Sequence, residues 1–110
     1  MKKLLSVILV AIALFSFAVA TPALAGDAAK GKQIFISECY ACHQGGKNLV
    51  QAPKTLSKED LEKYDKYSLD KIVYQITNGN SPMPGFGGHL TPAEIEDVAT
   101  YVLEQAEKGW

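Results

Sequence analysis

The stretch Cys39-Tyr40-Ala41-Cys42-His43 decides how this sequence is interpreted. It has the pattern C-x-x-C-H, which is typical of attachment sites for c-type haem. Two thiols at this spacing can each form a thioether with one vinyl group of the same porphyrin. The histidine that follows then lies on the same side as the thiols, and histidine is the usual proximal ligand of haem iron. The motif therefore predicts one covalently bound haem c, attached through Cys39 and Cys42, with His43 as an axial ligand.

Two other interpretations of the cysteines fit less well. A thioredoxin-like C-x-x-C occurs near a strand-helix-strand pattern, and the sequence shows no such pattern. A structural zinc site needs four ligands, whereas the chain offers only the two cysteines, His43 and the distant His89. Adjacent Cys42 and His43 are also awkward corners of one tetrahedron. The haem interpretation is favoured over both.

Residues 1–25 have the pattern of a signal peptide. Lys2 and Lys3 form a positive start, an apolar run covers residues 4–20, and Ala23-Leu24-Ala25 has the small residues that signal cleavage requires. The apolar run approaches transmembrane length, so an uncleaved membrane anchor is the alternative. We expect cleavage after Ala25, which leaves residues 26–110 as an exported protein that does not span a membrane.

Residues 26–110 are short enough for one domain, and an apolar core of this size gives only modest stability. A porphyrin at the centre of the core would add to it. The full chain has 11 lysines, no arginine and 12 acidic residues, and loss of Lys2 and Lys3 leaves a net charge of −3. A mildly acidic chain is a poor binder of nucleic acid.

The hydrophobic periodicity predicts an all-α fold of about four short helices. The expected helices cover residues 27–39, 58–64, 69–78 and 92–108, with residues 44–56 as a loop. Their expected N-caps are Asp27, Ser57, Ser68 and Thr91. The residues that begin at Ser57 and those that begin at Thr91 have the form of capping boxes. Gly79 and Gly109 are placed to end helices. The expected buried positions are Leu69, Ile72, Val73, Ile76, Ile95, Val98, Ala99, Val102 and Ala106.

The segment Ser81-Pro82-Met83-Pro84 predicts the second axial ligand of the iron. Proline on both sides holds Met83 in an extended, stiff loop, and a thioether is a good haem ligand that raises the reduction potential. His89 is the rival ligand, but Gly87-Gly88 before it restrains it less. Three tyrosines, Tyr64, Tyr67 and Tyr74, are either pocket residues or ordinary aromatics.

These features together resemble the class I cytochromes c, and among them the cytochromes c6 of cyanobacteria and algae. The resemblance covers residues 26–110. It implies a class I cytochrome c fold around one haem, with thioethers at Cys39 and Cys42 and axial ligands His43 and Met83. It also implies that Gly31 and Phe35 meet the last helix near Tyr101, and that Lys54 and Gln75 lie near the haem.

The resemblance implies an electron carrier rather than an enzyme. Such a monomer would take electrons from the cytochrome b6f complex and deliver them to photosystem I in the thylakoid lumen. A periplasmic donor to a terminal oxidase or peroxidase is the alternative. A small haem peroxidase would need an open sixth iron position. The chain departs from the family at His89, where relatives commonly carry arginine on the docking side.

Overall fold

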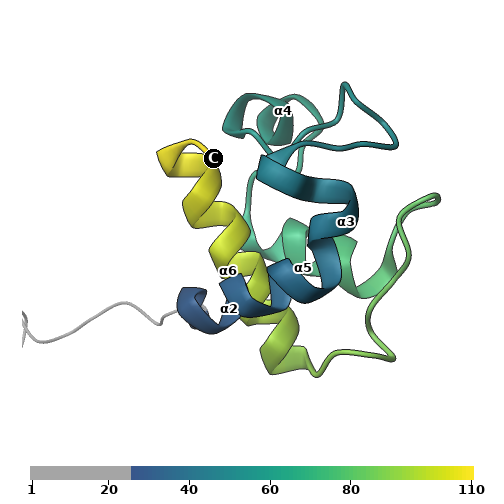
Figure 1. The fold of residues 1–110 in the computed structure, drawn as a ribbon, viewed down its shortest axis with the longest axis vertical. Coiled ribbons are helices and arrows are strands. Elements are labelled where there is room, and N and C mark those ends of the chain that lie inside the picture. Colours follow the sequence, from purple (N-terminus) through teal and green to yellow (C-terminus); the bar gives the residue numbers. More distant parts are fainter. Residues whose placement is uncertain (1–25) are drawn as a thin grey trace, which may run out of the picture.

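The computed structural model describes residues 26–110, so the expected signal peptide lies outside the described residues. The described part is helical, as predicted, and its only strand-like pairing is an isolated bridge between Asn80 and Met83. The elements, in chain order, are α2 (Ala28–Ile34), the π-helical turn η1 (Phe35–Cys39), α3 (Tyr40–His43), the 3-10 turn η2 (Gln44–Gly46), α4 (Lys58–Lys63), α5 (Leu69–Asn78) and α6 (Pro92–Lys108). Figure 1 shows these elements arranged as one bundle. None of the described helices has the length and hydropathy that a membrane crossing requires.

All four predicted N-caps are confirmed. The side chains of Asp27, Ser57, Ser68 and Thr91 each accept hydrogen bonds from backbone N–H groups in the first turn of their helix. Thr91 and Glu94 form the complete, reciprocal capping box. The second predicted box is only half present, because the Asp60 carboxylate accepts from Thr55 instead of from the Ser57 backbone. Capping therefore fixes where each helix begins.

The first helix differs from the prediction, which ended it at Cys39. The helical path continues through α3 to His43, and the turn Phe35–Cys39 is π-helical, with the N–H of Tyr40 donating to the carbonyl of Phe35. Residues three and four apart share one helix face. The continued helix therefore places Cys42 and His43 on the same side of the chain as Cys39.

The crossing of α2 and α6 fixes the N-terminal half of the bundle. Gly31 is buried there, and a Cβ atom at this position would lie 2.5 Å from the carbonyl carbon of Asp97 and 3.0 Å from Cβ of Tyr101. One turn later, the ring of Phe35 lies 5.4 Å from that of Tyr101 and 5.3 Å from that of Trp110. These contacts confirm that Gly31 and Phe35 meet the last helix near Tyr101.

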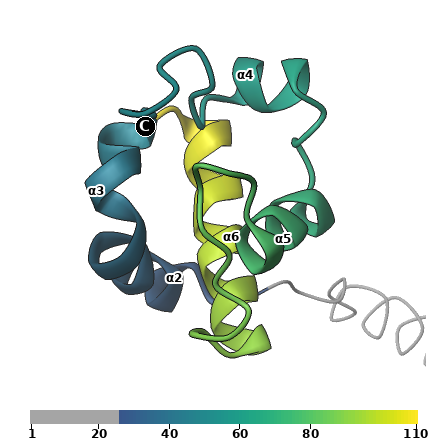
Figure 2. The ribbon, with the colours of Figure 1, turned by 90° about the vertical axis from the view of Figure 1, so that its right-hand side faces the viewer.

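Helix α6 is the centre of the bundle. Figure 2 shows it between α2 and α3 on one side and α5 on the other. The five α6 positions predicted to be buried are all buried, and so are Ile72 and Ile76 of α5. Leu69 and Val73 pack against this core from partly buried positions. The core therefore joins the elements that carry the two halves of the site.

Candidate cofactor site

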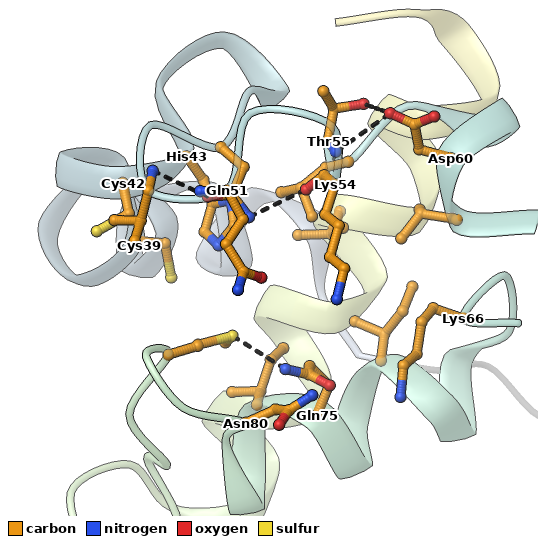
Figure 3. Close-up of a pocket in the computed structure, with 18 of the residues that line it drawn as sticks. Cys39, Cys42, His43, Gln51, Lys54, Thr55, Asp60, Lys66, Gln75 and Asn80 are labelled. Atoms are coloured by element: carbon orange, nitrogen blue, oxygen red, sulfur yellow. Dashed lines mark hydrogen bonds between the residues drawn. The ribbon is translucent and has the colours of Figure 1, made fainter. Parts of the chain in front are cut away.

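A cavity of about 340 Å³ lies against this core and is lined by all four predicted site residues, namely Cys39, Cys42, His43 and Met83. Figure 3 shows Cys39, Cys42 and His43 on one side of the cavity. Gln75 and Asn80 lie on the opposite side, near the methionine loop. Cavities of this size hold drug-sized ligands and cofactors. The fold thus brings together groups that are about 40 residues apart in the sequence.

A backbone contact orients the His43 ring. Its Nδ1 lies 2.9 Å from the carbonyl oxygen of Lys47. A carbonyl only accepts hydrogen bonds, so Nδ1 carries the proton and donates it. The other ring nitrogen, Nε2, then has its lone pair available for a metal, and such a second contact is what usually fixes the orientation of a ligating histidine. This carbonyl belongs to Lys47, the residue that follows the η2 turn, and no sequence pattern marks it.

Met83 is held by more than its neighbouring prolines. Its N–H donates to the carbonyl of Asn80 at 2.9 Å, and its own carbonyl accepts from the N–H of Asn80 at 3.0 Å. The side-chain amide of Gln75 donates to the sulfur at 3.4 Å, the dashed line that leaves Gln75 in Figure 3. The backbone of the loop and the position of its sulfur are therefore both fixed.

The two cysteine sulfurs are in different environments. Cys42 is exposed, whereas Cys39 is partly buried. Burial raises the pKa of the Cys39 thiol to about 11, and the charges of Glu38 and Cys42 act in the same direction. Within residues 26–110 no three His, Cys, Asp or Glu side chains cluster as a metal site would require.

The remaining walls divide into an apolar and a polar part. Phe35, Leu61, Ile72 and Val98 line the cavity from the core. Two cations, Lys54 and Lys66, reach toward it from one side in Figure 3. An apolar slot with cations at its edge suits a porphyrin, which has an apolar ring and two carboxylates. The residues present therefore fit haem.

The Asp60 carboxylate, also at the polar edge, is engaged by Thr55. Thr55 donates both its backbone N–H, at 3.1 Å, and its hydroxyl to Asp60. Hydrogen bonds from Thr55 lower the pKa of Asp60, with a smaller effect from Lys63. This pairing fastens the loop before α4 beside the cavity. The sequence analysis did not identify Asp60, Lys66 or Asn80 at the site, since nothing in their local pattern distinguishes them from surface residues.

The remaining residues that the sequence placed near the haem are two polar residues, three tyrosines and His89, and only some of them line the cavity. Lys54 and Gln75 line the cavity, and so does Tyr64. Tyr67 lies elsewhere and donates to the Glu107 carboxylate at 3.1 Å, while Tyr74 is 67% exposed. His89, the rival axial ligand, is not part of the cavity lining. Its Nε2 lies 3.0 Å from the Glu38 carboxylate, on the surface.

Comparison with known proteins agrees with this geometry. The family model described as "Cytochrome C oxidase, cbb3-type, subunit III" matches residues 26–102. Cytochrome c6 of Gloeothece citriformis is 58% identical over 110 residues, covering 100% of both chains. Cytochrome c6 of Nostoc sp. is 56% identical, covering 100% of this chain and 99% of the relative. The solved structure of cytochrome c6 from the diatom Phaeodactylum tricornutum is 47% identical with a TM-score of 0.76, covering 77% of this chain and 100% of the diatom chain.

The fold and the site define a class I c-type cytochrome. The family model matches residues 26–102, whereas the Gloeothece and Nostoc relatives match this chain over its whole given length. At this identity and coverage the chain belongs to the cytochrome c6 family. It is accordingly a photosynthetic electron carrier with covalently bound haem c, and not an enzyme.

Proposed function

We propose that Cys39 and Cys42 attach the haem and that His43 and Met83 ligate its iron. The observation that carries this proposal is that one cavity is lined by all four side chains, with His43 and Met83 each held by a neighbour. The bound haem supplies a one-electron couple, in which the iron alternates between its ferric and ferrous states.

The protein's part in this chemistry is to hold the ligands and the surroundings constant. The Lys47 carbonyl keeps His43 Nε2 available for the iron, and the backbone bridge to Asn80 holds the loop that carries Met83. Two protein ligands leave no open position for a substrate, which suits a carrier better than a peroxidase. The core side chains along the cavity exclude water, and the contact from Gln75 adjusts how strongly the sulfur donates.

The proposed donor is the cytochrome b6f complex and the proposed acceptor is photosystem I. Membership of the cytochrome c6 family supports both partners. The matching location is the thylakoid lumen, reached after removal of residues 1–25.

A periplasmic donor to a terminal oxidase is a second candidate function. One observation favours it, namely the match of residues 26–102 to a family model described by an oxidase subunit. The same fold and ligands would serve both roles, so the partner alone distinguishes them.

Flash kinetics with purified photosystem I test the main function. The reduced holoprotein should re-reduce the flash-oxidised photosystem at a rate that rises with its concentration. A rate no greater than that without the protein, together with rapid oxidation by a terminal oxidase, would instead establish the second function.

Mass spectrometry of the exported, denatured protein tests the attachment and the cleavage together. The expected mass is that of residues 26–110 plus one haem, and loss of haem on denaturation would contradict the thioethers.

A further inference from the structure

The first described residue, Gly26, lies in a polar contact with α6 that the electron-carrier function does not use. Its backbone N–H donates to the Thr100 hydroxyl oxygen at 2.8 Å. The Thr100 hydroxyl in turn donates to the carbonyl of Glu96 at 2.7 Å. Because the proton of that hydroxyl is used by Glu96, the oxygen faces Gly26 as an acceptor.

A carboxylate lies directly beside the same backbone. Asp97 Oδ1 accepts from the N–H of Asp27 at 2.7 Å. A Cβ atom built on Gly26 would lie 2.5 Å from that oxygen and 2.6 Å from Cα of Asp97. The carboxylate is therefore in van der Waals contact with Gly26, and a side chain at position 26 would displace it.

Cleavage after Ala25 would change the chemistry of this contact. An amide nitrogen has one N–H and no charge, whereas the new α-amino group is an ammonium with three N–H donors below its ordinary pKa of about 7.7–8.0. Two carboxylates are near it. Asp97 comes from α6, and Asp27, the N-cap of α2, is the next residue along the chain. Both carry the sign of charge that attracts the ammonium.

We propose that Asp97 and Thr100 form a binding site for the α-ammonium group of Gly26, which exists only after the signal peptide has been removed. The inference rests on the proposed cleavage after Ala25. It makes maturation a stabilising step, since the ion pair fastens the start of α2 to α6 next to the Gly31 crossing. The uncleaved chain keeps the Thr100 hydrogen bond but lacks the charge.

Thermal unfolding of two holoproteins tests the inference. One begins at Gly26, and the other keeps Ala23-Leu24-Ala25, which moves the amino group about 10 Å along the chain. We expect the chain that begins at Gly26 to have a Tm about 2–5 °C higher, the size typical of one partly exposed ion pair in a domain of this length. Added salt should reduce the difference, because it screens exposed charges.

Asp97→Asn separates charge from shape, since asparagine keeps an oxygen that accepts from Asp27 while losing the negative charge. In this variant the Tm difference between the two chains should fall to less than half. The matched control is Glu96→Gln, which removes the exposed carboxylate next along α6 and should leave the difference intact. An equal Tm for both chains, or a difference that Asp97→Asn leaves unchanged, would overturn the inference. Because both chains are made with defined starts, the result does not depend on the natural cleavage site, which the mass of the exported protein reports separately.

Discussion

Replacing Gly31 by alanine should separate α2 from α6. The added Cβ would lie 2.5 Å from the carbonyl carbon of Asp97, and closer still to its oxygen. An ordinary contact begins at about 3.4 Å, so the two helices must move apart by about 1 Å. The atoms on the α6 side belong to helix backbone, which cannot rotate away as a flexible side chain would.

The cost of this movement exceeds the gain from alanine. Alanine favours a helix over glycine by about 1 kcal/mol. Overpacking a tight contact costs about 1–3 kcal/mol, and more when backbone must move. A shift of about 1 Å also loosens Phe35 against Tyr101 and Trp110, whose ring centroids are 5.4 and 5.3 Å away. Because these terms add, we expect a net loss of about 2–3 kcal/mol, or roughly 10–20 °C in Tm for a domain of this length.

Thermal and urea unfolding of the holoprotein, followed by far-UV circular dichroism, would measure the loss. Gly88→Ala is the matched control, because a Cβ at Gly88 would have no atom within 4 Å. A glycine of this kind in a loop should tolerate alanine or gain slightly from it, by about 0.4–1 kcal/mol. If Gly31→Ala is no less stable than Gly88→Ala, the close crossing does not limit the size of residue 31.

Three further predictions concern the site and its surroundings. Met83→Ala should keep the haem attached, open the iron to external ligands and lower the reduction potential by on the order of 100 mV. His89→Ala should change neither ligand binding nor the potential. Ligand-binding titrations and potentiometry would show which of the two residues ligates the iron. Gln75→Leu removes the amide that donates a hydrogen bond to the Met83 sulfur. The sulfur should then donate its electron pair to the iron more strongly, and the reduction potential should fall by roughly tens of mV. Gln51→Leu, a change at a cavity residue without this contact, should leave the potential unaltered. The hydrogen bond and charge of Glu38 raise the pKa of His89 above its ordinary value of about 6.5. Below about pH 6.5 His89 therefore keeps its positive charge. As the pH rises through the raised pKa of the folded protein, His89 loses this charge and the stabilising ion pair with Glu38. His89→Arg should therefore speed reduction of photosystem I more at about pH 8.5 than at about pH 5.5. Equal rates for the variant and the unchanged protein at both pH values would place His89 outside the docking face.

The parts of the fold that depend on local chemistry could be predicted from the sequence. N-caps act through side chains a few residues from the N–H groups they accept from, so Asp27, Ser68 and Thr91 marked helix starts correctly. The π-helical turn Phe35–Cys39 could not be predicted in this way, because no side-chain cap marks it. The same holds for Asp60, whose carboxylate had two possible partners in the sequence and pairs with Thr55 in the fold.

At the candidate site, too, the residues that belong to contiguous motifs could be predicted from the sequence, and the contacts that orient them could not. The C-x-x-C-H motif and the two prolines around Met83 are contiguous patterns whose chemistry is local, and they predicted four residues that the fold brings into one cavity. The contacts that orient them are not contiguous patterns. A carbonyl such as that of Lys47 exists at every residue, and only the path of the η2 turn shows which one faces His43.

The two axial sides of the site differ in how much of the fold each one needs. Cys39, Cys42, His43 and the carbonyl that orients its ring all lie within residues 39–47. Met83, by contrast, reaches the cavity only when α5 and the loop after it are packed on α6. Unfolding would therefore release the methionine and leave the haem on a short peptide that already carries its other ligand. On the proposed attachment and ligation, a denatured molecule would keep its cofactor and could refold without reacquiring it. The bond between the iron and the Met83 sulfur would then be a spectroscopic reporter of whether the whole chain is folded.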